Sequence, residues 1–243
     1  MKPLSSDDER ALRLARKRAG WGLDLTPADL ADMRSEWAPR VMPDGKDEEE
    51  HFALCRPDGS TTAAVGPRWL FHLFGLCHRA VHVGLSTPAG LVILQRRSPT
   101  MADWPGAWDM AVAGHVPQRD DGSDMGYEAA ARKEAFEELG LPLEGMNALF
   151  AEGRLVPIGA PYASFEQDEG RNPPFYNAES RQLYGATLTP EGYARLVPDY
   201  EELSGVFVCS REEAWSMLER ATVAGAMRHS LTRYLDWLVQ PRA

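Results

Sequence analysis

Three glutamates stand three and four residues apart near the middle of the chain: Glu134, Glu137 and Glu138, in the stretch K-E-A-F-E-E-L-G-L. If this stretch is helical, the three carboxylates share one face of the helix. Like charges so close repel one another, so the spacing favours a bound cation, and hard oxygen ligands suit Mg²⁺ or Mn²⁺. The simpler alternative, for the cluster taken alone, is a solvated helix face.

The helix is predicted by the C-terminal half of Gly114–Leu141. Gly140 is the residue type that ends helices in the left-handed conformation, and Pro142 prevents continuation. Ser123 or Asp124 is the expected N-cap. The apolar side chains that should line the buried face are those of Ala129, Ala130, Ala131, Ala135, Phe136 and Leu139.

With Gly114 upstream, the whole stretch resembles the Nudix box, G-x5-E-x7-R-E-U-x-E-E-x-G-U, in which U is aliphatic. Lys133 takes the place of the usual arginine. The box is also five residues too long, and the excess lies in Arg119–Gly126, so Asp120 or Asp121 must stand in for the first glutamate. The second half of the box matches at Lys133, Glu134, Ala135, Glu137, Glu138, Gly140 and Leu141.

The segments PRWLFHLFGLCHRAVHV, LQRRS, WPGAWD and AGHV resemble the Nudix branch that contains the isopentenyl-diphosphate isomerases. In those isomerases three histidines and two glutamates hold a divalent metal beside a catalytic cysteine. The resemblance puts His72, His78 and His115 on or near the histidine positions, and Glu179 on one glutamate position. Whether these histidines bind a second metal or are structural stays open, with a structural role favoured for His72.

The chain departs from the isomerase pattern at other positions. Ala113 stands where the cysteine should be, and Asn177 takes the place of the second glutamate. Lysines that follow the Arg-Arg pair in the isomerases are replaced by Met101 and Ala102. These departures favour hydrolysis over isomerisation.

Substrate-binding residues are expected at two places. Arg96 and Arg97 alternate along a predicted strand, so only one of them faces the cleft, and a fork of donors suits a diphosphate. We expect Arg97 to be that residue, with a surface ion pair as the alternative. His115, next to the glycine of the box, is expected near the site.

The resemblance implies a Nudix-type hydrolase that cleaves a diphosphate bound to an organic group. Glu134, Glu137 and Glu138 would hold Mg²⁺ (or Mn²⁺), and the Ala113 carbonyl would complete the metal shell. Glu134 or Glu179 would be the general base. The alternatives are an isomerase-like enzyme and a Nudix module that binds a nucleotide without cleaving it. Nucleotides, dinucleotides, isoprenoid diphosphates and thiamine diphosphate derivatives all stay open as substrates.

Composition limits the partners. The 243 residues have a formal net charge of −10, which argues against a nucleic-acid polymer or an anionic membrane and fits a small-molecule substrate. No apolar run approaches the roughly 20 residues of a membrane span. The three cysteines, Cys55, Cys77 and Cys209, match no metal or disulfide spacing, so we expect reduced thiols and a cytoplasmic protein.

The order of elements predicts an α/β fold, because mixed strands with a helix on each side form a sandwich. The resemblance implies the same: a Nudix-type α/β/α sandwich with a mixed sheet. Pro161–Asn177 is expected to be a long loop over the substrate. Strands are expected at His51–Cys55, Ser60–Val65, Leu76–Leu85, Leu91–Gln95, Arg154–Ala160, Leu183–Leu188 and Gly205–Cys209, and late helices at Ser210–Ala221 and Ala224–Leu238.

The first 50 residues predict a helical N-terminal extension, followed by the Nudix domain at residues 51–243. Ser6–Glu9 is a capping-box pattern, Thr26 is an N-cap before Pro27, and the acidic Asp44–Glu50 is the seam. The extension carries too much apolar surface, Trp37 included, to remain in water. It should therefore dock on the core or on a second subunit, which leaves a homodimer open.

Overall fold

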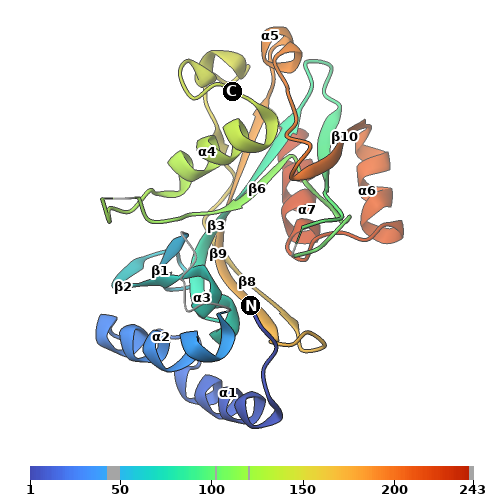
Figure 1. The fold of residues 1–243 in the computed structure, drawn as a ribbon. Coiled ribbons are helices and arrows are strands. Elements are labelled where there is room, and N and C mark those ends of the chain that lie inside the picture. The colour runs from blue at the N-terminus through green and yellow to red at the C-terminus, as the bar shows by residue number, and fades with distance from the viewer. Residues whose placement is uncertain (43–49, 102, 120, 241–243) are drawn as a thin grey trace. The chain divides into compact units, whose positions relative to one another are not determined.

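The computed structural model describes residues 1–42, 50–101, 103–119 and 121–240 (Figure 1). Most of the predicted seam at Asp44–Glu50, together with Ala102 and Asp120, lies outside this range. The chain forms two compact units. Unit 1 comprises Met1–Ala80, His115–Met125 and Pro161–Arg181, and unit 2 comprises Val81–Gly114, Gly126–Ala160 and Gln182–Ala243. The predicted boundary near residue 50 does not coincide with this division, because the first unit continues to Ala80.

Unit 1 begins with two helices, α1 (Ser6–Ala19) and α2 (Pro27–Val41). The N-cap of α1 is Ser5, one residue before the predicted capping box, and its side chain accepts the Asp8 N–H. The predicted cap at Thr26 is confirmed, since Thr26 and Asp29 form a complete capping box. Both helix starts therefore follow from local side-chain hydrogen bonds.

These helices pack on a hairpin and a short helix of the same unit. The hairpin joins β1 (His51–Cys55) to β2 (Thr61–Pro67) in antiparallel pairing, as expected, and α3 (Arg68–Phe74) follows directly. Trp37 of α2 is 1% exposed and meets the ring of Phe74 edge-on, with the ring centroids 5.6 Å apart. The core of unit 1 is thus built partly from the N-terminal helices.

The prediction of a long loop at Pro161–Asn177 is wrong. The segment forms β8 (Tyr162–Asp168) and the start of β9 (Phe175–Thr187). The two strands pair from Tyr162 opposite Arg181 to Asp168 opposite Phe175. β8 alternates between partly buried and exposed residues over most of its length, so one face of the strand is exposed while its backbone pairs with β9. Gly170, Pro173 and Pro174 lie in the turn that connects the two strands, and Pro161 precedes β8.

The sheet has the order β10-β4-β3-β9-β7, in which β5 also pairs with β4 and β6 with β3. The predicted strands at 76–85, 91–95, 183–188 and 205–209 are confirmed, whereas the one at 154–160 shrinks to two residues. The strands with parts in unit 2 are β3 (Cys77–Ser86), β4 (Val92–Arg97), β5 (Trp108–Met110), β6 (Val112–His115), β7 (Val156–Pro157), β9 and β10 (Leu203–Cys209).

In unit 2 helices cover both faces of the strands, which confirms the sandwich (Figure 1). Leu94 of β4 packs in the cluster that contains residues of α6 (Arg211–Arg220) and α7 (Met227–Leu238). The next residue, Gln95, points to the opposite face and reaches α4 (Tyr127–Leu139). The connections carry a 3₁₀ turn, Met146–Leu149, and α5 (Pro190–Ala194).

Helix α4 ends as predicted and begins differently. Gly140 caps it in the left-handed conformation, with φ 69°, and its N–H bonds to Phe136. The N-cap is Gly126, with no side-chain bond, so the prediction of Ser123 or Asp124 is wrong. Phe136, expected to face inward, is 48% exposed. Within the described residues, no helix combines the length and apolar composition that crossing a membrane requires.

Candidate functional site

The first candidate site is the glutamate face of α4 in unit 2. Glu138 is 3% exposed. Its Oε1 accepts a hydrogen bond from Gln95 Nε2 at 3.1 Å, and its Oε2 accepts one from the backbone N–H of Ala113 at 3.0 Å. One carboxylate therefore ties α4 to both β4 and β6. The N–H of Ala113 was not anticipated from sequence, where only its carbonyl was considered.

Burial raises the pKa of Glu138 well above its usual value, and the nearby carboxylates of Glu134 and Asp109 add to this. The hydrogen bonds from Ala113 and Gln95 oppose the shift without cancelling it. The charged form of Glu138 is therefore costly in this surrounding. A cation beside the carboxylate would favour the charged form and lower the pKa of Glu138 again.

Glu134 lies directly against the glycine of the predicted box. A Cβ placed on Gly114 would stand 2.3 Å from the carboxyl carbon of Glu134, closer than any side chain tolerates. The Glu134 side chain is 12% exposed. A larger residue at position 114 would displace the Glu134 side chain, because the carboxylate of α4 packs onto the backbone of β6.

One cation serves the more exposed carboxylates. Lys133 Nζ lies 3.3 Å from Glu134 Oε1 and forms an ion pair with Glu137, whose side chain is 44% exposed. Burial lowers the pKa of Lys133, but the two carboxylates outweigh burial and raise it. Lysine thus occupies the arginine position of the box, and negative charge still exceeds positive charge on this face.

The arginine pair divides between the two faces of β4. Arg97, two residues from Gln95, lies on the face that holds Glu138. Its Nη1 is 3.8 Å from Asp109 Oδ2, and its Nε donates to the carbonyl of Asp103 at 3.0 Å. Arg96 lies on the other face, with its guanidinium 5.9 Å from the ring centroid of Trp108. This geometry favours Arg97, as expected, while its contact with a substrate stays a prediction.

The second candidate site is a histidine cluster in unit 1. His72, His78 and His115 each place a ring nitrogen within 4.8 Å of the others. Within the described residues, no other three His, Cys, Asp or Glu side chains bring their ligand atoms so close together. The carboxylates of the α4 glutamates are farther apart than this. No sequence rule for spacing predicts such a cluster, because the histidines come from α3, β3 and β6.

The outer nitrogens of two of these rings are already bonded. His72 Nδ1 lies 3.3 Å from the carbonyl of Tyr176, and His78 Nδ1 lies 3.1 Å from that of Leu76. The Nε2 atoms of both rings are buried and have no hydrogen-bond partner among the described residues. This arrangement fixes the tautomer and leaves Nε2 with a lone pair, as in histidines that bind metals.

Both rings are neutral at physiological pH. Burial, reinforced by the neighbouring histidines, lowers the pKa of His72 well below its usual value and that of His78 to about 3. Phe52 covers the cluster: its ring stacks on His78 with centroids 4.6 Å apart. His72 and His78 therefore contribute uncharged ring nitrogens to a site with an apolar wall.

Glu179 of β9 belongs to this cluster. It is 2% exposed, and its Oε1 lies 3.6 Å from His115 Nε2 and 4.0 Å from His78 Nε2. Burial alone would raise its pKa, but Arg181, which forms an ion pair with it, and His115 hold the pKa well below the usual value. The carboxylate stays ionised. Arg181 is not among the site residues predicted from the sequence. The signal that could have identified it is its charge within a buried strand.

Two further predicted elements of the box can be located. Asp121, a proposed substitute for the first glutamate, is exposed in unit 1, where its carboxylate accepts the Ser123 N–H at 2.8 Å. Asp124 forms an ion pair with Arg79 in the same unit. Both carboxylates therefore have partners within unit 1.

A serine, a histidine and an aspartate also meet in unit 2. His82 Nδ1 lies 2.7 Å from Ser230 Oγ, and His82 Nε2 lies 3.5 Å from Asp109 Oδ1. These are the residue types of a nucleophilic triad, but Ser230 is 0% exposed and the other two at most 3%. A substrate cannot reach the hydroxyl, so the network joins α7 to the sheet and is not catalytic.

The chain is similar to proteins of one family along most of its length. A family model described as NUDIX domain matches residues 77–234. The chain is 36% identical over 105 residues to Nudix hydrolase 3 of Arabidopsis thaliana, covering 42% of this chain and 13% of that protein. It is 25% identical over 155 residues to isopentenyl-diphosphate delta-isomerase 2 of Homo sapiens, covering 60% and 61%.

An uncharacterised Nudix hydrolase of Streptomyces coelicolor, SCO1686, is 42% identical over 66 residues, which are 27% of this chain and 34% of that protein. This chain therefore spans less than two thirds of the length of each of these relatives. Among solved structures, DR0079 of Deinococcus radiodurans gives a TM-score of 0.53 at 18% identity, covering 76% of this chain and 99% of that one. That similarity concerns the fold.

Proposed function

This chain belongs to the NUDIX domain family, and on that basis we propose that it is a hydrolase that cleaves a diphosphate linked to an organic group with the help of divalent cations. The observation that carries the proposal is the buried carboxylate of Glu138 beside Glu134 on α4. Mg²⁺ or Mn²⁺ fits these donors, because they are carboxylate oxygens that come from one helix.

Glu134, Glu137 and Glu138 would hold the cation, with the Ala113 carbonyl as a further oxygen ligand. A cation there would neutralise the oxygens of the diphosphate and make a nearby water more acidic. The chain itself supplies the positioning: Gln95 and the Ala113 N–H fix the Glu138 carboxylate, and that carboxylate fixes the helix. Arg97 would orient the diphosphate from β4.

Glu134 is the better candidate for the general base. Its side chain is partly exposed, so a water molecule can reach the carboxylate. Glu179, the other candidate, is nearly inaccessible, and Arg181 and the histidines keep its pKa low, which makes it a weak proton acceptor. We therefore assign Glu179 to the histidine cluster and Glu134 to proton transfer.

The test is release of phosphate from a panel of organic diphosphates with Mg²⁺ or Mn²⁺, using Glu137→Gln and Glu138→Gln. We expect each variant to lose about 100-fold or more in turnover, since charge stabilisation of the transition state is removed. The fold should persist: in Glu138→Gln the new amide can donate to Gln95 Oε1, which lacks a partner in the described structure. The matched control is Glu128→Gln, an exposed glutamate of the same helix. Near-normal turnover in both site variants would contradict the assignment.

The histidine cluster favours a second candidate, an enzyme of the isopentenyl-diphosphate isomerase class with a metal bound by nitrogen ligands. The imidazoles of His72, His78 and His115 and the carboxylate of Glu179 suit Zn²⁺ or Mn²⁺. Against isomerisation, Ala113 cannot supply the proton of a cysteine. Metal analysis of the wild type and His78→Ala tests the centre, and detection of dimethylallyl diphosphate from isopentenyl diphosphate would establish the isomerase.

A further inference from the structure

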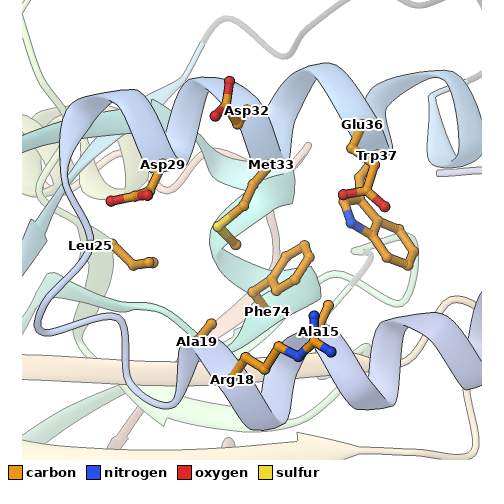
Figure 2. Close-up of a pocket in the computed structure, with 10 residues that line it drawn as sticks. All are labelled: Ala15, Arg18, Ala19, Leu25, Asp29, Asp32, Met33, Glu36, Trp37 and Phe74. Carbon is orange, nitrogen blue, oxygen red and sulfur yellow. The ribbon is translucent and has the colours of Figure 1, made fainter.

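Two pockets lie on the helical part of unit 1, and they differ in charge. The pocket in Figure 2, about 290 Å³, lies between α1 and α2 over the apolar side chains of Met33 and Phe74. Its rim carries Asp29, Asp32 and Glu36 from α2, with Arg18 of α1 on the opposite side. It is acidic and does not suit an anion.

The other pocket, about 280 Å³, collects cations instead. Arg13, Arg16 and Lys17 line it from consecutive turns of α1, where spacings of three and four residues bring side chains onto one face. Arg13 and Lys17 are exposed, and neither has an ion-pair partner among the described residues. Three cations so close, in a chain of net charge −10, form a local site for an anion.

Arg16 is held in place. Its Nε donates to the carbonyl of Phe74 at 3.2 Å, and its guanidinium lies 3.0 Å from the ring centroid of Tyr176. Burial lowers the pKa of Arg16, and the nearby Tyr176 and Glu169 offset only part of this decrease. The arginine is therefore ordered before any ligand arrives, which lowers the entropic cost of binding.

Two exposed aromatic rings form the other wall. Trp21 is 38% exposed and Phe165 43% exposed, and their rings lie 6.2 Å apart with planes inclined by 24°. Gly20 and Gly75 line the pocket between rings and cations, so no side chain fills that space. The two exposed rings adjoin each other at the pocket, so their apolar faces are available to a ligand. A planar heterocycle can stack on them.

We propose that this pocket binds a nucleotide, with its base against Trp21 and Phe165 and its phosphates at Arg13, Arg16 and Lys17. Three cations indicate a di- or triphosphate and not a monocarboxylate. The site is separate from the one under the proposed function: it carries no metal-binding carboxylate among its lining residues. It also lies on the other face of β8 from the histidine cluster, because Ser164 bonds to Glu179 and the next residue, Phe165, points away.

The test is calorimetric binding of ADP to the full chain in EDTA, which excludes hydrolysis. We expect the double variant Arg13→Gln/Lys17→Gln and, separately, Trp21→Leu to weaken binding about tenfold or more. Arg16 is left intact, since it supports Tyr176, which holds His72. The control Arg10→Gln/Arg18→Gln removes equal charge from α1 outside the pocket and should change the affinity less than about twofold.

Adenosine and pyrophosphate serve as half-ligands, and each should bind far more weakly than ADP. If the control variant weakens ADP binding as much as the pocket variant does, binding is unspecific and the proposal is overturned. An unchanged affinity for ADP in Trp21→Leu would also overturn it, because the base would then not stack on Trp21. Loss of ADP binding in Glu138→Gln would place the ligand at the glutamate face and likewise overturn it. The rate at which the Arg13→Gln/Lys17→Gln variant hydrolyses organic diphosphates, measured separately with Mg²⁺ or Mn²⁺, should equal that of the wild type. The two proposals can therefore fail independently.

Discussion

At the scale of single residues, the glutamate face depends on close approach. Gly114 has no side chain because the carboxylate of Glu134 occupies the space that a Cβ would need. The buried carboxylate of Glu138 accepts hydrogen bonds that Gln95 Nε2 and the Ala113 N–H donate from the sheet. The residue types of the box therefore have packing reasons as well as chemical ones.

Replacing Gly114 tests this packing. Gly114→Ala should lower both stability and turnover, because its methyl group would stand 2.3 Å from the Glu134 carboxyl carbon and must displace it. We expect a destabilisation of about 1–3 kcal/mol, typical of overpacking, in chemical denaturation. Gly205→Ala in β10 is the control, since no atom lies within 4 Å of its added Cβ. Equal effects of the two substitutions would show that Gly114 has no special role.

The cysteines give a pH-dependent prediction. Burial and then Glu213 raise the pKa of Cys209 to about 11, so its thiolate is scarce at pH 8 and becomes more abundant as the pH rises toward that value. Cys55 and Cys77 are buried together, with their sulfurs 3.5 Å apart. A thiol reagent should therefore label the folded protein at pH 8 about two orders of magnitude more slowly than an ordinary thiol.

In denaturant all three thiols should react at once. Glu213→Gln should shift the onset of Cys209 labelling to lower pH, since it removes the neighbouring charge while an amide can still accept the Ser210 N–H of the helix cap. Fast labelling of the folded chain at pH 8 would contradict the burial of these thiols.

At the scale of elements, helix starts and stops followed from local chemistry, whereas faces did not. Thr26, Ser210 and Gly140 cap helices as their residue types predict. The orientation of each helix depends on what it packs against. Leu14 of α1, for example, is apolar and yet 58% exposed.

Trp37 is the expected anchor of α2. Trp37→Ala should destabilise the protein by about 3–5 kcal/mol, because it leaves a cavity beside Phe74 in the core of unit 1. Leu14→Ala on α1 should change stability by less than about 0.5 kcal/mol, as an exposed site does. Guanidinium unfolding curves of both variants measure the difference. If Trp37→Ala lowers the free energy of unfolding only slightly, residues other than Trp37 must anchor α2 to the core of unit 1.

At the scale of the whole molecule, the compact units cut across the order of the chain. The N-terminal helices belong to a unit that continues to Ala80 and includes the β8–β9 hairpin. The strands β3 and β9 each begin in one unit and end in the other. The proposed boundary at residue 50 therefore separates segments that share a core.

Removing residues 1–50 should accordingly do more than shorten the chain. Leu30 and Trp37 share a cluster with Leu70, Phe71 and other core residues of unit 1, and truncation would expose that cluster to water. We expect aggregation or a clearly lower melting temperature, measured by light scattering and calorimetry against the full chain. A truncated protein that is soluble, monomeric and equally stable would make the segment dispensable.

The sequence alone determined the family, the glutamate helix, its glycine cap and most of the strands, because these follow from local spacing and residue type. Gly140 ends α4 and Gly114 precedes it, as the pattern of the box indicates. The loop predicted at Pro161–Asn177 is a hairpin instead. The turn residues occupy only its tip, and the strand before them, which has no apolar run to reveal it, pairs with β9.

Only the tertiary structure decided which charges are buried and which residues meet. Gln95 and Ala113 are far from Glu138 in the chain, so their hydrogen bonds to it could not be inferred from spacing. The same holds for Trp21 and Phe165, which are 144 positions apart in the sequence and stack in the fold. For the histidine cluster, the resemblance to the isomerases indicated the residues, and the tertiary structure shows how closely they meet. Contacts between distant segments depend on sheet pairing and packing, and a single sequence does not encode these in any local pattern.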